Sequence, residues 1–281
     1  MKFTKRENWQ AHTVFSVILF FYCSITIVLL LNLFLSSFKN SGEFFMAPWA
    51  LPKSFNLANY QRLFVRDSFM RYYKNSFIVM LCSIAGVFSL ACPAAYGLGR
   101  FNFRGNSALR FYFLIGMMVP GQLAIIPLFN LVKGLGLMDK IGGLIVIYMS
   151  GVALSIFILT KFTLTIPESL RESAKIDGAS EFVIFLKIFL PLMKPGIGSL
   201  IPLTAISYWN DFFIPLIFIT SDKSRTVPLG LTRYFTATGF DLQYLGVVFA
   251  AMSVAVFPLI VIYLVGSKNI MSGIMLGSVK Q

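Results

Sequence analysis

The sequence has few groups that could carry out chemistry on a substrate. Its 281 residues include only 11 acidic residues, one histidine and three cysteines. The single imidazole, His12, cannot build a zinc site or a histidine-dependent catalytic pair. Cys23, Cys82 and Cys92 fall inside apolar runs, in an odd number and without paired spacing, so neither a disulfide nor a metal site is predicted. No apolar stretch carries paired carboxylates or a nucleophile beside a base, which argues against an enzyme.

Charged residues are scarce, whereas apolar residues are abundant. Charged side chains make up 12% of the chain and hydrophobic ones 57%, and that charged fraction is about half the value of an ordinary soluble domain. Six stretches have roughly the 20 apolar residues that a bilayer-spanning helix needs. They are residues 14–35, 77–98, 109–132, 141–159, 196–219 and 245–265. We therefore predict an all-α, polytopic membrane protein with six transmembrane helices.

The net charge of +13 would suit a nucleic-acid partner if the cations were clustered on one surface. Here they lie in loops that flank apolar spans, so anionic lipid headgroups are the better explanation and no nucleic-acid partner is predicted. The positive-inside rule favours a cytoplasmic N-terminus, because Lys2, Lys5 and Arg6 precede the first span and an acid-free loop carries Arg100 and Arg104. The first apolar run is too long for a signal-peptide core. We predict a multi-pass protein of the cell membrane (plasma or inner) with both termini in the cytoplasm.

The third predicted span contains helix-breaking residues. Val-Pro-Gly-Gln at residues 119–122, followed by Pro127, predicts a break or kink near its middle. Backbone groups freed there must bond to neighbours or to a watery cavity. The break is either a packing kink or a half-helix end beside a transport path, in which case Gln122 offers a hydrogen-bonding amide.

The fifth predicted span contains Trp209, Asn210 and Asp211, and Asp211 is the only acidic residue inside any apolar span. An unpaired carboxylate in mid-span costs roughly 2.5 to 3.5 kcal/mol on insertion scales, so this one must face protein or water. It is either a structural group bonded to neighbouring helices or backbone, or part of a substrate path together with Asn210. The Trp209 ring could stack on a sugar face, or simply anchor the helix at the membrane interface.

The densest cluster of charge lies between the fourth and fifth predicted spans, in residues 166–195. Pro167 suits the first turn of a helix and Gly178 suits its end, so we predict one short helix over residues 167–177. A second, apolar helix is predicted over residues 182–192. A small amphipathic helix held between two spans has a shape that docks into a groove on a partner.

Charges and apolar residues of the short helix are spaced for different roles. The spacing of three favours ion pairs of Glu168 with Arg171 and of Glu172 with Lys175. The apolar side is expected to comprise Leu170, Ala174 and Ile176.

Six residues of this loop stand at a fixed spacing: Glu172, Ala174, Gly178, Ile188, Leu190 and Pro191. Their pattern resembles the EAA loop of ABC importer permeases, which reads E-A-A, three residues, G, nine residues, I-x-L-P. Ser173 replaces the middle alanine, a small residue for a small one. In that family the loop is the cytoplasmic coupling helix, which inserts into a cleft on the ATP-binding subunit and transmits its opening and closing. The resemblance implies ATPase-coupling roles for Glu172, Ser173, Ala174, Asp177, Gly178, Ile188, Leu190 and Pro191.

Weaker signatures extend the resemblance over nearly the whole chain. They are Asn59-Tyr60, Asn75-Ser76, Ala94-Ala95-Tyr96, Arg104-Gly105, Ile176-Asp177-Gly178-Ala179, Trp209-Asn210-Asp211 and Gly277-Ser278-Val279-Lys280. Together they are similar to the permeases of carbohydrate importers, the maltose-type (CUT1) group, and to its shorter, MalG-like subunit. The resemblance implies the type I ABC importer permease fold and a carbohydrate substrate. It also implies three kinds of protein partner: a longer, MalF-like permease, ABC ATPase subunits and an extracellular solute-binding protein.

The same resemblance implies a division of the chain into three parts. Residues 1–71 would hold the N-terminal cytoplasmic tail, the first span and an exterior segment, residues 72–266 the ABC transmembrane type-1 domain, and residues 267–281 a cytoplasmic tail. The sequence has no G-x-x-x-x-G-K-[ST] loop to hold nucleotide phosphates. We therefore expect no cofactor bound by this chain, with ATP and Mg²⁺ used by the partner ATPase.

Two alternatives stay open at this stage. The EAA loop alone does not distinguish a sugar permease from an ABC permease for amino acids, phosphate or metals. From a different class, an ion-coupled secondary transporter or channel would need more intramembrane ionisable groups than Asp211 alone.

Overall fold

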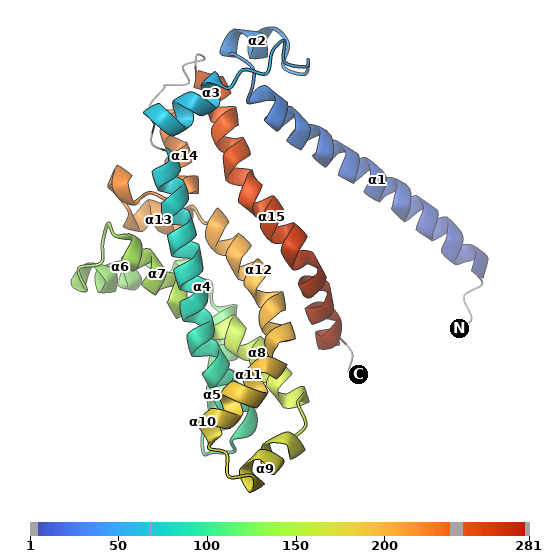
Figure 1. Ribbon diagram of the computed structural model, residues 1–281, viewed down its shortest axis with the longest axis vertical. Helices are drawn as coiled ribbons and strands as arrows, with labels where there is room; N and C mark the ends of the chain where they lie inside the picture. Colours follow the sequence, from blue (N-terminus) through green and yellow to red (C-terminus); the bar gives the residue numbers. More distant parts are fainter. Residues whose placement is uncertain (1–4, 68, 237–243, 279–281) are drawn as a thin grey trace. The chain divides into compact units, whose positions relative to one another are not determined.

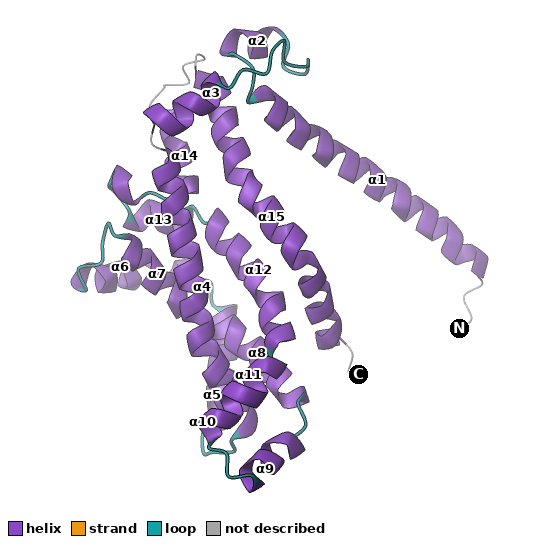
Figure 2. Ribbon diagram, in the orientation of Figure 1, coloured by secondary structure: helices purple, strands orange, loops and turns teal. Residues whose placement is uncertain are grey.

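The fold is helical throughout the part of the chain that the structure describes. A computed structural model covers residues 5–67, 69–236 and 244–278 (Figure 1). Within those ranges every regular element is a helix and no strand is present (Figure 2), which confirms the all-α class.

Two compact units make up the chain. The first comprises Met1–Phe69 and Leu231–Val256, and the second comprises Met70–Gly230 and Phe257–Gln281. The three-part division with boundaries at residues 71 and 266 stays a prediction.

The first unit begins with a long helix, α1 (Lys5–Ser36), of which His12–Ser36 is long and apolar enough to cross a membrane. Short helices α2 (Ser41–Met46) and α3 (Ala58–Gln61) follow, and a π-helical turn covers Arg62–Arg66. The chain returns to this unit in α14 (Val227–Thr236) and α15 (Leu245–Ser278), each of which belongs in part to the second unit.

Asn59 and Tyr60 hold the segment that follows α1. Asn59 Nδ2 donates hydrogen bonds to Ser37 O at 2.8 Å and to Lys39 O at 2.9 Å. The Tyr60 hydroxyl lies 2.7 Å from Ser37 Oγ. A Cβ atom at Gly246 would lie 2.5 Å from Asn59 Nδ2, so only glycine lets α15 approach this closely. The Asn59-Tyr60 signature is therefore explained by local structure.

The second unit contains the remaining apolar helices. Helix α4 (Phe69–Arg100) is long enough to cross a membrane by itself, as is Leu245–Lys268 of α15, whereas three bent pairs meet the same criterion only together. The pairs are α5 (Asn106–Met118) with α6 (Ile125–Gly134), bent by 92°; α7 (Ile141–Ser150) with α8 (Ala153–Thr165), by 44°; and Glu181–Leu192 with α12 (Lys194–Asn210), by 68°. If each pair crosses once, the described residues contain six spans, the number predicted.

Helix breaks were predicted correctly in one span and missed in another. Helix α5 ends at Met118, and Val119 has extended backbone angles, which confirms the break predicted before Gln122; a 3-10 turn, Gly121–Ala124, separates α5 from α6. The break between α7 and α8, after Gly151, was not predicted.

The fifth predicted span, residues 196–219, is also interrupted, and this break was not predicted either. Helix α12 stops at Asn210, and the chain resumes in α13 (Phe213–Phe218) after Asp211. Aspartate is unfavourable in the interior of a helix, because its carboxylate forms hydrogen bonds to nearby backbone N–H groups in non-helical conformations. A 3-10 turn at Asp222–Ser224 then leads to α14.

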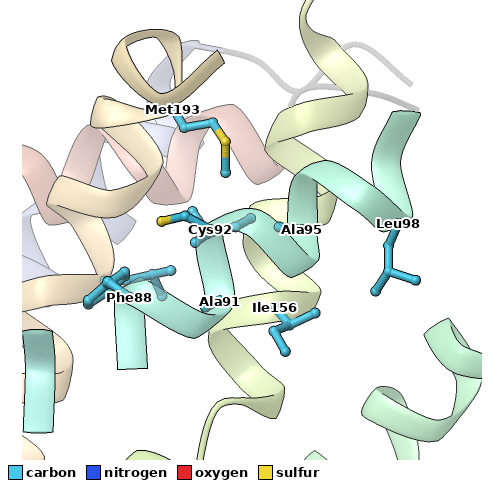
Figure 3. Close-up of a cluster of buried hydrophobic side chains, with 9 residues drawn as sticks. Phe88, Ala91, Cys92, Ala95, Leu98, Ile156 and Met193 are labelled. Carbon is cyan, nitrogen blue, oxygen red and sulfur yellow. The ribbon is translucent and has the colours of Figure 1, made fainter. Parts of the chain in front are cut away.

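Small side chains on α4 allow the helices of the second unit to pack closely. Ala91, Cys92 and Ala95 are buried, and they face residues from α8 and from the chain around α12 (Figure 3). The cluster comprises Phe88, Ala91, Cys92, Ala95, Leu98, Ile156, Leu159, Met193 and Leu200. Cys92 thus serves as a small core residue, and all three cysteines are free thiols.

The N-terminal part of α4 is tied to the segment 222–227. Asn75 Nδ2 donates to two backbone carbonyls of this segment, at 2.8 and 2.9 Å, and Ser76 Oγ accepts a backbone N–H from it at 2.8 Å. Gly230 lies against the Tyr72 ring with no room for a Cβ atom. These contacts give the Asn75-Ser76 signature a structural role.

Asp139 fixes the connection between α6 and α7. Its Oδ1 accepts the backbone N–H groups of Ser221 at 2.8 Å and Thr220 at 2.9 Å, and its own backbone is left-handed, with φ of 58°. Partial burial opposes ionisation, but these N–H donors outweigh it and hold the pKa of Asp139 below its usual value. The carboxylate is therefore a charged bridge between two loops.

Replacing Asp139 by asparagine removes the charge while keeping a residue that tolerates the left-handed backbone. We expect the free energy of unfolding to fall by about 1 kcal/mol at neutral pH. Because the folded-state pKa is lowered, the carboxylate's contribution is complete above the unfolded value of about 3.9 and is lost as the pH falls through the folded-state pKa. Thermal melts in mild detergent at pH 7 and pH 3 check this. A Tm difference between the two proteins that does not narrow at pH 3 would contradict it.

Candidate functional site

The predicted short helix is present as α9 (Ser169–Ile176), and a glycine ends it. Gly178 has φ of 80°, a backbone conformation that glycine adopts without strain. The Gly178 N–H donates to Lys175 O at 3.0 Å, and the Ala179 N–H donates to Ala174 O at 2.9 Å. This pair of bonds is the Schellman motif, which satisfies the last carbonyls of a helix.

The exposed face of α9 differs from the expected one. Ala174 is buried, in a cluster with Tyr96. Leu170 is 40% exposed and Ile176 is 86% exposed, so the expectation of a single apolar side was wrong. Ile176 follows Ala174 by two residues, or about 200° around the helix, and therefore points away from the protein.

The outward face of α9 carries polar residues as well. Glu172, Ser173 and Asp177 are all exposed. The expected Glu172–Lys175 ion pair does not form, because Lys175 Nζ lies 2.7 Å from Glu181 Oε1 instead. Within the described residues, Glu172 has no ion-pair partner. Two carboxylates and the Ile176 side chain are therefore available to a partner.

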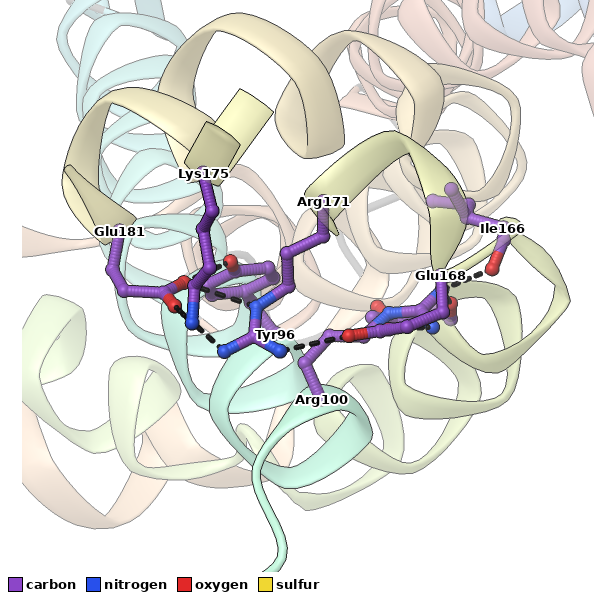
Figure 4. A network of polar contacts seen from close by, with 8 residues as sticks. Tyr96, Arg100, Ile166, Glu168, Arg171, Lys175 and Glu181 are labelled. Carbon is purple, nitrogen blue, oxygen red and sulfur yellow. Dashed lines mark hydrogen bonds and ion pairs between the residues drawn. The ribbon is translucent and has the colours of Figure 1, made fainter. Parts of the chain in front are cut away.

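Arg171 joins α9 to the next helix, α10 (Glu181–Ile184). Its guanidinium donates to Glu181 Oε1 at 2.6 Å and Oε2 at 3.2 Å, and to Glu168 Oε1 at 2.7 Å, which confirms the predicted Glu168–Arg171 pair (Figure 4). Hydrogen bonding to Glu181 raises the pKa of Arg171 further above its already high value. The Tyr96 hydroxyl of α4 donates to Glu181 Oε2 at 2.7 Å, so a spanning helix takes part in the same network.

Arg100, the last residue of α4, also belongs to this network. It donates to Glu168 Oε2 at 2.8 Å and to the backbone carbonyls of Thr163 and Ile166 at the end of α8 (Figure 4). Its side chain is only 6% exposed and lies over the Phe189 ring. From the sequence, Arg100 was used only to orient the chain, and this role was not predicted. The sequence did offer one signal for it, namely a cation at the end of a span, before a loop without acidic residues that could pair with it.

The second part of the loop is anchored in the core. Ser180 caps α10 by accepting the Val183 N–H at 3.4 Å, and a π-helical turn (Phe185–Phe189) and α11 (Leu190–Leu192) follow. Ile188 packs on the cluster around Tyr96, and Leu190 packs on the cluster around Cys92. Pro191 is exposed. Ile188 and Leu190 therefore hold the loop to the spanning helices, while α9 presents the outward face.

The four residues predicted for a substrate path lie at two different helix breaks. Gln122 is exposed in the turn between α5 and α6, and Asn210 is exposed at the end of α12. The Trp209 ring is 2% exposed and packs edge-on against Tyr73 and Phe77, with ring centroids 5.3 and 4.9 Å away. In this conformation the Trp209 ring is covered by protein.

Asp211 is bonded to backbone and to a neighbouring helix. Its Oδ1 accepts the N–H groups of Phe213 at 2.9 Å and Ile214 at 3.3 Å, which caps α13, and its Oδ2 accepts the Tyr148 hydroxyl at 2.8 Å. The Tyr148 ring stacks on Tyr208 with centroids 4.5 Å apart. These contacts favour the structural alternative for Asp211, and its partner Tyr148 was not predicted from the sequence.

Apolar helices that are long enough to span a membrane, alone or as bent pairs, together with one exposed polar loop define a multi-pass membrane protein. The fold is that of a chain in a crystal structure of a bacterial ABC transporter involved in the import of the acidic polysaccharide alginate. The TM-score is 0.83 at 23% identity, over 95% of this chain and 99% of that one.

Sequence comparison gives the family. The chain matches the family of the binding-protein-dependent transport system inner membrane component over residues 91–272, and it belongs to that family. It is 33% identical over 269 residues to the arabinooligosaccharides transport system permease protein AraQ of Bacillus subtilis, which covers 92% of this chain and 94% of the relative. It is 30% identical over 262 residues to the diacetylchitobiose uptake system permease protein NgcG of Streptomyces coelicolor, with 93% and 86% covered. The protein is thus a multi-pass ABC transporter permease and not an enzyme.

Replacing Arg171 by glutamine should loosen α9 from α10, because its guanidinium, 13% exposed, binds both Glu168 and Glu181. We expect backbone amides of α9 to exchange with deuterium at least about tenfold faster, since breaking a largely buried pair costs more than 1 kcal/mol. Lys175→Gln is the matched control, because that cation is 47% exposed and its ion pair should be worth less than about 1 kcal/mol. Equal exchange rates in both variants would show that Arg171 is not central.

Proposed function

We propose that this chain and a second, longer permease form the path through which a carbohydrate enters the cell. The carbohydrate is delivered by an extracellular solute-binding protein, and transport is driven by ABC ATPase subunits. The observation that carries the proposal is the loop 166–195, in which a network of hydrogen bonds and ion pairs that ends on α4 and α8 holds α9 with one face outward. Support for the substrate class comes from AraQ, NgcG and the alginate importer, whose names specify saccharides.

The outward face of α9 suits a cleft with basic and apolar walls. Glu172 and Asp177 offer two carboxylates without ion pairs among the described residues, and Ile176 offers an apolar side chain that is almost fully exposed. Such a small helix docks as a unit, with charge fixing its orientation and apolar contact adding affinity. ATP and Mg²⁺ are used by the partner, since this chain lacks a phosphate-binding loop.

Movement of α9 reaches the spanning helices through charged hydrogen bonds. Glu168 is held by Arg100 and Arg171 together, at 2.8 and 2.7 Å, so a displaced α9 pulls on the ends of α4 and α8. Transport then follows alternating access: closure of the ATPase subunits on ATP moves the coupling helix, and the spans reorient around the path. The loop and both termini lie on the cytoplasmic side in this arrangement.

Gln122 and Asn210 are the two exposed amides that we propose for the path, because amides donate to and accept from sugar hydroxyls. Trp209 and Asp211 would support the helix break behind them. The bonds of Asp211 to Tyr148 and to the start of α13 leave no free intramembrane carboxylate for coupling to an ion, which weighs against a secondary transporter.

Purification of the tagged chain from its native membrane in mild detergent tests the assembly. We expect a second permease and an ABC ATPase to co-purify in fixed stoichiometry. The ATPase rate of this complex should rise when a solute-binding protein loaded with its saccharide is added. Recovery of the chain alone, or as a homo-oligomer without an ATPase, would overturn the proposed function.

Two substitutions of Gly178 test whether the left-handed turn after α9 is needed for coupling to the ATPase. A Cβ atom at this position meets nothing within 4 Å, so Gly178→Val acts inside the chain only through backbone strain of about 1–2 kcal/mol. Asparagine tolerates the left-handed backbone and is the matched control. We expect Gly178→Val to abolish uptake and to weaken association with the ATPase, and Gly178→Asn to retain more of both. Normal uptake by Gly178→Val would contradict the coupling role of this turn.

A further inference from the structure

A cavity formed by α4, α5 and α8 combines two cations with an apolar wall. Its volume is about 210 Å³, and its lining includes Arg110, Phe111, Leu114, Phe157, Lys161 and Leu164. Helices α5 and α8 pack against each other. Among the described residues that line the cavity, none is acidic.

Neither cation has a counter-ion in the part of the chain that the structure describes. Arg110 donates from one terminal nitrogen to Leu98 O, but its Nε is buried without a hydrogen-bond partner. Lys161 is exposed, and its Nζ lies 5.8 Å from the centre of the Phe157 ring. A buried guanidinium nitrogen without a partner is unfavourable, so this site favours an anion with several acceptor oxygens.

Both cations lie close to the ends of their helices, where a spanning helix approaches the lipid headgroups. Arg110 is the fifth residue of α5 (Asn106–Met118), and Lys161 precedes the end of α8 (Ala153–Thr165) by four residues. At 1.5 Å per residue each cation is about 6 Å from its helix end, near the boundary between headgroups and hydrocarbon. Phe111 is 60% exposed beside Arg110 and continues the apolar wall.

We propose that this cavity binds one anionic phospholipid. Its phosphate lies between Arg110 and Lys161, and an acyl chain lies along Phe111 and Leu164. Charge complementarity selects this occupant, because a neutral lipid or an apolar protein segment leaves both cations uncompensated. Its place in the cytoplasmic leaflet rests on the orientation proposed above.

A neighbouring hollow extends the site toward the headgroup. Arg110 also lines a second cavity with Arg104 and Ser107, in the loop between α4 and α5 and the first turn of α5. A third cation and a hydroxyl are therefore available to a headgroup that projects beyond the phosphate. This arrangement favours a headgroup with hydroxyls, such as glycerol, over a bulky trimethylammonium.

The test measures lipid retained by the tagged full chain, purified with its partners in mild detergent and incubated with equimolar phosphatidylglycerol and phosphatidylcholine. Native mass spectrometry counts the bound molecules. We expect phosphatidylglycerol to be retained selectively, and the Arg110→Gln/Lys161→Gln double variant to bind it about 10- to 30-fold more weakly. Arg110→Lys should keep most of the preference, and Lys133→Gln, an exposed lysine outside the cavity, should keep all of it.

Three outcomes would overturn the lipid site. They are equal retention of the two lipids by the wild-type chain, unchanged retention by the double variant, and complete displacement of phosphatidylglycerol by millimolar inorganic phosphate, which would indicate an anion site without a role for the acyl chain. Co-purification of the ATPase is scored in the same samples. A failure of the lipid site is therefore distinguishable from a failure of the importer assembly.

Discussion

The buried guanidinium of Arg100 is the group on which the geometry of the loop 166–195 depends. A buried cation is costly unless hydrogen-bonded partners surround it. Arg100 meets this condition at its two terminal nitrogens, which bond two carbonyls at the end of α8 and Glu168 just before α9, whereas its Nε has no hydrogen-bond partner among the described residues. Glu168 binds Arg171, Arg171 binds Glu181, and Glu181 accepts the hydroxyl of Tyr96, one helical turn from Arg100 on α4. The chain of contacts therefore begins and ends on the same spanning helix, α4, and it holds α9 in place without a partner protein.

Sequence predicted the elements of this loop because their signals are local. Pro167 and Gly178 set the limits of α9 within two residues, and the spacing of three identified the Glu168–Arg171 pair. The partner of Lys175, Glu181, could not be predicted in this way, because it depends on where α10 lies after the glycine turn. That position is set by tertiary contacts. The exposure of Ile176 likewise follows from the burial of Ala174 against Tyr96, a contact between residues far apart in the chain.

The helix breaks show the same division between local and distant causes. The break between α5 and α6 is predictable from Pro120, whereas the break between α7 and α8, after Gly151, has no strong signal in the local sequence. Asp211 was recognised as costly in an apolar span, but its partners were unknown from sequence. The structure supplies them as a tyrosine from α7 and two N–H groups of α13, so the carboxylate that interrupts one helix also begins the next.

The closed circuit around Arg100 has a consequence for biosynthesis. Its partners lie 63 to 68 residues further along the chain. At a synthesis rate of about 5–20 residues per second, they emerge roughly 3 to 14 seconds after it. During that interval the guanidinium must remain hydrated at the membrane surface. The end of α4 therefore cannot reach its final position until α8 and the residues before α9 have been synthesised. The rate of translation thus sets the earliest time at which the loop can fold.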